Sequence, residues 1–149
     1  VLEHVVDIDT TLESCYKRIK SGGCLYVSVP NDYSYIHRSY MKNKNMDEME
    51  CPWFAPPEHL SYFTPESLVK TVEKFGFELV DLLADYPIDL FILNESFDYY
   101  SNETGRDAHD IRVKYTNIMS RDIEAAYSIS KGHMKLGLGR SILGVFRKK

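Results

Sequence analysis

The sequence lacks several features that mark specialised classes of protein. No apolar run approaches the roughly 20 residues that span a bilayer, and the first residues do not resemble a signal peptide. Lys and Arg (18) do not outnumber Asp and Glu (22), so there is no basic excess for nucleic acid. The three cysteines show no CxxC spacing. We therefore expect reduced thiols, a cytoplasmic location, and neither a membrane span nor a nucleic-acid partner.

What the sequence does contain is the composition of a folded domain. Its 149 residues are 44% hydrophobic and 13% aromatic, which is enough for a buried core. No repeat or low-complexity tract divides the chain. We expect a single domain over residues 1–149.

The first half predicts a helix followed by a buried strand. Residues 1–7 have the pattern of a chain leaving a strand, and Asp9, Thr10 and Thr11 offer N-cap oxygens for a helix to about residue 20. That helix has one apolar face, formed by Leu12, Cys15, Tyr16 and Ile19. Residues 24–29 are almost continuously apolar, which is typical of a strand buried on both faces.

The second half predicts two more strands and two helices. Thr64 followed by Pro65 is a strong helix start, and residues 77–83 predict the next strand. An apolar stripe predicts a helix over 111–130, and residues 141–146 have the composition of a final strand. The alternation of helices and strands is typical of an α/β layered sheet.

Two segments show no sustained period and are candidates for binding loops. Residues 31–57 contain aromatics, prolines and scattered charge, and we expect a lid or substrate loop there. Residues 86–138 predict a mostly helical insertion before the last strand.

Four features in order resemble the second half of a class I S-adenosylmethionine (SAM) dependent methyltransferase, in the group of ubiquinone-pathway and other small-molecule enzymes. They are Leu2-Glu3-His4-Val5, Lys20-Ser21-Gly22-Gly23, Val29-Pro30-Asn31, and Glu58-His59-Leu60 leading to Thr64-Pro65. Gly137-Leu138-Gly139-Arg140 before an apolar stretch is similar to the turn into the family's last, antiparallel strand.

The resemblance implies a Rossmann-like sheet of which this chain supplies about strands 4 to 7. It also implies methyl transfer from SAM to a small-molecule acceptor, with the glycine-rich cofactor loop expected upstream of Val1. Glu3, His4 and Val5 would line the cofactor pocket. A sheet that lacks its first strands would expose an edge, so we also expect a homo-oligomer or further chain to cover it.

The candidate catalytic residues are His59 and His4, because an imidazole can accept the proton that a methyl acceptor loses. His59 could equally anchor its loop, and alignment of the reactants alone can supply much of the rate. Candidate substrate contacts are Asn31, Tyr33, Trp53 and Phe54, together with His59. Asn31 could instead be an ordinary turn residue, and the aromatics could form a minor core.

No residue spacing predicts a metal site, and Asp107, His109 and Asp110 are better explained as an exposed helix start. Two other functions remain open. The chain could be a non-catalytic interaction module on a truncated fold, or a nucleotide-dependent oxidoreductase, since dinucleotide-binding folds share the same alternation.

Overall fold

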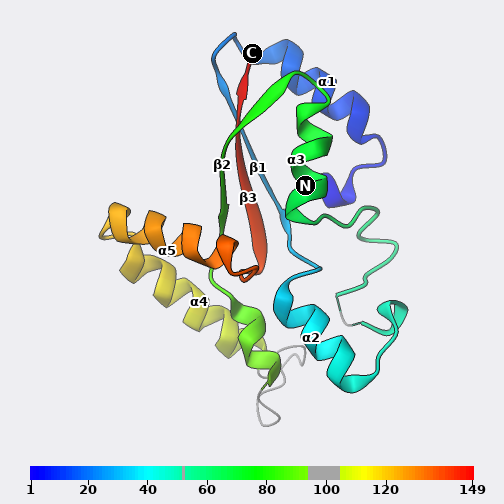
Figure 1. Ribbon diagram of the computed structural model, residues 1–149, viewed down its shortest axis with the longest axis vertical. Coiled ribbons are helices and arrows are strands. Elements are labelled where there is room, and N and C mark those ends of the chain that lie inside the picture. The colour runs from blue at the N-terminus through cyan, green and yellow to red at the C-terminus, as the bar shows by residue number, and fades with distance from the viewer. Residues whose placement is uncertain (52, 94–104) are drawn as a thin grey trace.

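The computed structural model describes residues 1–51, 53–93 and 105–149, arranged on a three-stranded sheet (Figure 1). Its strands are β1 (Cys24–Pro30), β2 (Phe77–Ala84) and β3 (Ser141–Lys148). The central strand β3 pairs antiparallel with both neighbours. β1 and β2 therefore run in the same direction, and their carboxyl ends meet the start of β3 at one end of the sheet. The expected antiparallel last strand is confirmed.

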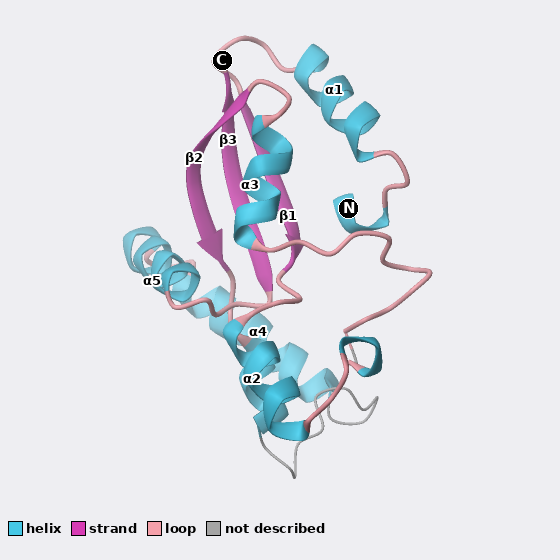
Figure 2. Ribbon diagram, turned by 45° about the vertical axis from the view of Figure 1, so that its right-hand side comes forward, coloured by secondary structure: helices cyan, strands magenta, loops and turns pink. Residues whose placement is uncertain are grey.

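Helices lie against one face and one end of this sheet (Figure 2). α1 and α3 cover one face, whereas α2 lies beyond the carboxyl end of β1, and α5 packs against β2 near its carboxyl end with α4 beside it. The helices are α1 (Ile8–Arg18), α2 (Tyr35–Lys44), α3 (Pro65–Glu73), α4 (Gly105–Met119) and α5 (Ile123–Lys135), with short 3-10 helices η1 (Leu2–His4), η2 (Glu48–Glu50) and η3 (Ile88–Leu93). The chain is an α/β protein.

The core lies between α1, α3 and the covered face of the sheet. Leu68 and Val72 of α3 are fully buried, as is Phe146 of β3. Burying each large apolar side chain contributes about 1.5 to 3 kcal/mol before entropy is subtracted. Cys15, Tyr16 and Ile19 pack against this core beside the buried Leu12, which confirms the predicted face of the first helix.

Side-chain caps fix where these two helices begin. Thr64 and Ser67 cap each other's backbone N–H groups at the start of α3, as predicted. For α1 the predicted caps were wrong, because Asp7 accepts from the N–H of Thr10 at 2.9 Å and the helix starts at Ile8. Residues 1–7 form no strand, and Leu2–His4 is a 3-10 helix.

β1 is buried on only one face, which corrects the prediction of a strand buried on both. Val27 and Val29 point into the core, whereas Tyr26 is 59% exposed. The reason is that α1 and α3 both pack on the face toward which Val27 and Val29 point, whereas Tyr26 on the other face borders an open hollow that it shares with α4. Among the described residues β1 also pairs on one side only, with β3.

Two segments are more regular than the sequence indicated. Residues 31–57 contain α2, which begins after Ser34, whose hydroxyl accepts from the N–H of His37. The predicted single helix over 111–130 is two helices, because the chain turns at 120–122 and Asp122 caps α5. Within the expected insertion, residues 94–104 lie outside the described part of the chain.

A turn that contains Gly137 and Gly139 joins α5 to β3, and this turn passes close to the end of β2. Gly139 has φ +97°, and a Cβ there would lie 2.5 Å from Cβ of Ala84. Only glycine fits both the left-handed backbone and the close approach. This turn delivers Arg140 to the same sheet end as the residues that follow β1.

Candidate functional site

The residues predicted for the site fall into three neighbouring groups near the carboxyl end of β1. The first is a half-exposed group of Glu3, His4 and His59, here called the open cluster. The second is the aromatic wall, Tyr33, Trp53 and Phe54. Asn31 lies in a third group that the sequence did not predict, here called the sealed cluster: Asn31, Asp32, His37, Asp89 and Arg140.

The open cluster forms where the loop before α3 packs on η1. The backbone oxygen of Glu3 accepts from the N–H of Leu60 at 2.7 Å and of Ser61 at 3.2 Å. These bonds bring His59 beside His4, with ring centroids 4.8 Å apart in an edge-on arrangement. Two segments more than 50 residues apart in sequence therefore share one site.

His4 is oriented by two oxygens. Its Nδ1 lies 2.6 Å from the carbonyl oxygen of Glu58, and since a carbonyl only accepts, Nδ1 carries the proton. Its Nε2 then presents a lone pair, 3.3 Å from Oε1 of Glu3. The side chain of His4 is 52% exposed, so the ring borders solvent.

Glu3 and His59 are less accessible than His4. Glu3 is 8% exposed, and Oε1 of its carboxylate lies 3.3 Å from Nε2 of His4. Nδ1 of His59 is buried and has no hydrogen-bond partner among the described residues. The site thus contains one carboxylate and two imidazoles with uncommitted nitrogen atoms.

The open cluster also has the donor set of a metal site. One ligand atom from each of Glu3, His4 and His59 lies within 4.8 Å of the others. Two imidazoles and a carboxylate are ligands that Zn²⁺ accepts. The sequence predicted no metal site, and that stays a prediction.

Val5 ends η1 in an extended conformation, and its N–H donates to the carbonyl of Leu2 at 3.2 Å. It is partly buried directly after the open cluster. Its predicted cofactor contact remains a prediction.

The aromatic wall surrounds a small cavity of about 50 Å³. Tyr33, Trp53 and Phe54 line it together with Tyr62. Phe54 stacks on Tyr62 at 5.3 Å, and Tyr62 lies 6.1 Å from the ring of His59, so the wall adjoins the open cluster. Burial raises the pKa of Tyr33, with nearby acidic groups adding to the effect, and this phenol stays neutral.

Trp53 is the buried member of this wall and stacks on the sealed cluster. Its indole is parallel to the imidazole of His37, with ring centroids 3.9 Å apart and planes 8° apart. Trp53 is 6% exposed, so it is a core residue on one side and a cavity wall on the other.

The sealed cluster gathers side chains from four segments at the end of the sheet. Nη1 of Arg140 lies 2.9 Å from Oδ1 of Asp32, and Nε2 of His37 lies 3.1 Å from Oδ1 of Asp89. Asn31 is 1% exposed, and its side-chain amide donates to the carbonyl of Gly139 at 3.1 Å. Open α/β sheets bind ligands outside the carboxyl ends of their strands. The sealed cluster lies at that end of the sheet.

The sequence signals for the sealed cluster were weak. Asn31 and Asp32 follow a strand end, and Arg140 precedes the last strand, so their positions could have been noticed. His37 and Asp89 lie in segments with no apolar period. Only the packing of α2 against η3 brings these two together.

A larger cavity, of about 250 Å³, lies between α4, α5 and the end of β2. Its lining includes Tyr86, Tyr115, Met119 and Asp85. Burial raises the pKa of Asp85, although hydrogen bonds from Ser141 oppose that change. This cavity lies in the predicted insertion, but no candidate site residue lines it.

Comparison with known proteins gives a family for the first half of the chain. Residues 1–82 match a family model described as a methyltransferase domain. No curated protein matches the chain. Within the described residues, no helix combines the length and apolar character that crossing a membrane requires.

Proposed function

The chain belongs to the methyltransferase domain family, and from that premise we propose that it transfers a methyl group from SAM to a small-molecule acceptor. The observation that supports this most directly is the open cluster, in which Glu3, His4 and His59 converge at an accessible place. These residues come from two of the four motifs that carry the resemblance.

In the proposed reaction an oxygen, nitrogen or carbon atom of the acceptor attacks the sulfonium methyl of SAM. If that atom carries a proton, one of the two imidazoles accepts it, and a positioned base of this kind contributes about 100-fold or more. The Nδ1 of His4 is committed to Glu58, so the base on that ring would be Nε2. Alignment of the two reactants supplies the remaining acceleration.

The aromatic wall would hold the acceptor, with Tyr33, Trp53 and Phe54 as stacking surfaces. The cavity of about 50 Å³ between them is smaller than a typical ligand pocket, so binding requires these side chains to move apart. Asn31 is 1% exposed, and a contact between Asn31 and the substrate would need the sealed cluster to open.

The cofactor would occupy the crevice outside the carboxyl ends of the strands, with Glu3, His4 and Val5 along it. We propose that β1, β3 and β2 are the last three strands of a Rossmann-like sheet. The free edge of β1 supports this, because an apolar hollow of about 380 Å³ lined by Leu2, Leu12 and Val27 runs beside it. Further strands would fill that hollow.

The same free edge favours a second candidate, a non-catalytic interaction module. An unpaired strand edge beside exposed apolar residues is a template for pairing with another chain. In that case the homo-oligomer or partner predicted from the sequence would occupy the edge. Binding of a cofactor separates the two candidates.

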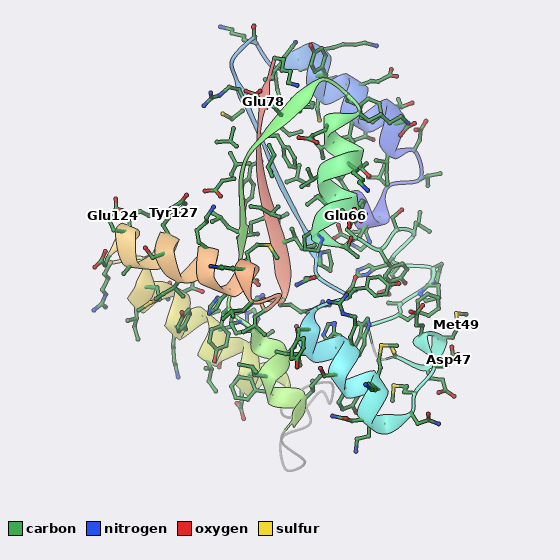
Figure 3. All side chains as sticks on the ribbon, in the orientation of Figure 1. Asp47, Met49, Glu66, Glu78, Glu124 and Tyr127 are labelled. Carbon is green, nitrogen blue, oxygen red and sulfur yellow. The ribbon has the colours of Figure 1, made fainter. Side chains whose placement is uncertain are left out.

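The test is calorimetric titration of the chain with S-adenosylhomocysteine, the demethylated product. We expect a dissociation constant in the micromolar range, weakened by Glu3→Gln and unchanged by Glu66→Gln. Glu66, labelled in Figure 3, is a matched control because it is an exposed carboxylate on α3 that pairs with Lys70. An absence of binding would contradict the proposed function of this chain and favour the interaction module.

A further inference from the structure

His37 is a fully buried histidine whose two ring nitrogens both face oxygen acceptors. Nδ1 lies 3.1 Å from the carbonyl oxygen of Asp32, and Nε2 lies 3.1 Å from Oδ1 of Asp89 in an ion-pair contact that lacks hydrogen-bond geometry. Since the carbonyl cannot donate, Nδ1 carries a proton. A neutral ring would leave the lone pair of Nε2 near a carboxylate, and at this fully buried place no solvent screens the repulsion, as it does at the half-exposed His4. A proton on Nε2 replaces that repulsion with an attraction between opposite charges.

The charges around His37 support the same protonation state. Asp32 and Asp89 are both 1% exposed, and the contacts in the described residues give them one guanidinium, that of Arg140. Residues 94–104 contain no Lys, Arg or His that could add another cation. A buried unpaired carboxylate is costly, so a positive charge on His37 balances the cluster.

Charged groups face His37 from three neighbouring segments. Asp32 lies before α2, Asp89 lies in η3, and Arg140 precedes β3. Farther along the aromatic wall, burial raises the pKa values of Cys51 and Tyr33, so neither adds charge at neutral pH. The ionisation of the sealed cluster is therefore decided among His37 and its three charged neighbours.

The other face of the His37 ring carries Trp53. The two rings are parallel at 3.9 Å, an arrangement in which a protonated imidazole attracts the electron-rich face of an indole. Because His37 is 0% exposed, it does not touch a substrate. Its effect can reach the cavity only through Trp53.

We infer that His37 is a positioning residue: its imidazolium, fixed between Asp89 and the carbonyl of Asp32, holds Trp53 in the aromatic wall. The charge on the His37 ring thus sets the position of the indole in the wall. That the wall receives the methyl acceptor rests on the proposed function. The positioning of Trp53 does not.

The first test is nitrogen-15 NMR of the labelled full chain, which distinguishes an imidazolium from a neutral imidazole. We expect two similar ring-nitrogen shifts for His37 at neutral pH, identified by their loss in His37→Gln. Two clearly different shifts, as in a neutral tautomer, would overturn the inference. This measurement on the unmodified protein decides the matter even if a variant fails to fold.

The second test uses fluorescence, because Trp53 is the only tryptophan in the chain. A stacked imidazolium quenches indole emission more than a neutral imidazole does. We expect Asp89→Asn to split the His37 nitrogen shifts and raise the emission of Trp53. Unchanged shifts and emission in that variant would contradict the inference.

The matched control is Asp9→Asn, which makes the same chemical change in an exposed ion pair with Lys74. It should alter neither the nitrogen shifts of His37 nor the emission of Trp53. Neither measurement involves SAM or methyl transfer, so failure of the proposed function and failure of this inference give different results.

Discussion

The chain contains two histidine–carboxylate clusters that are built in opposite ways. In the open cluster the side chain of His4 is 52% exposed, and its two ring nitrogens lie near oxygens of Glu58 and Glu3. In the sealed cluster His37 is 0% exposed and both of its nitrogens face oxygens. A histidine beside a carboxylate can therefore take part in a reaction in the open cluster and position a neighbouring side chain in the sealed cluster. The difference in solvent access decides which role each can have.

The largest expected effect comes from breaking the sealed cluster. Asp89→Asn should lower the free energy of unfolding by about 3 to 5 kcal/mol, because it leaves the buried His37 and the partly buried Arg140 with too little negative charge. Urea denaturation measures this. Asp9→Asn, in an exposed pair, should cost about 0.5 kcal/mol. Equal effects of the two variants would mean that burial does not strengthen the dependence of His37 and Arg140 on Asp89.

The next effect tests the backbone that supports the sealed cluster. Gly139→Ala should cost about 3 kcal/mol, because φ is +97° and the new Cβ would meet Ala84. The carbonyl of Gly139 would also move away from the amide of Asn31. Thermal unfolding is a suitable measurement, and Gly132→Ala in α5, where a Cβ meets nothing within 4 Å, is the control.

The open cluster should show the reverse pattern, with a large effect on activity and a small one on stability. His59→Ala should lower the rate of methyl transfer about 100-fold, and its free energy of unfolding should change by about 1 kcal/mol or less. Release of S-adenosylhomocysteine with an accepted substrate measures the rate. A rate within about twofold of that of the unmodified protein would leave His59 only an anchoring role.

The smallest effect concerns an ion pair of intermediate exposure, between β2 and α5. Asp81 accepts hydrogen bonds from Lys131 and from Tyr127, which Figure 3 labels. Burial pushes the pKa of Asp81 up, but these bonds bring it below the ordinary value of 3.8. Its stabilisation is therefore present above that value and is lost as the pH falls through the lower folded pKa.

Asp81→Asn should accordingly cost about 1 kcal/mol at neutral pH and almost nothing in strong acid. Unfolding curves at both pH values measure the difference. A cost that stays constant with pH would show that packing of Asp81, rather than its charge, joins α5 to the sheet.

Elements with strong local signals could be predicted from the sequence, and others could not. The cap at Thr64 and the apolar face of the first helix located α3 and α1 to within about two residues. α2 was missed because its buried residues, Ile36 and His37, form too short a stripe to stand out. The break before Ile123 was missed because the apolar stripe continues across it, although Asp122 is a cap residue.

The candidate site was predictable residue by residue but not as an arrangement. Resemblance to the family selected His4 and His59 separately, and the bonds from Leu60 and Ser61 to Glu3 bring them together. The sealed cluster had no comparable signal, because its members belong to four segments of the chain. In a loop, the sequence pattern around a polar residue does not distinguish a buried side chain from an exposed one.

The sequence by itself determined the three strands, the helices α1 and α3, the family, and the side chains available for chemistry. These follow from local periodicity, caps and motif spacing, which act within a few residues. The tertiary structure decided which strand faces are buried, that β3 lies between β1 and β2, and which histidine is accessible. Burial and charge pairing depend on segments far apart in the chain, and only the folded packing brings them into contact.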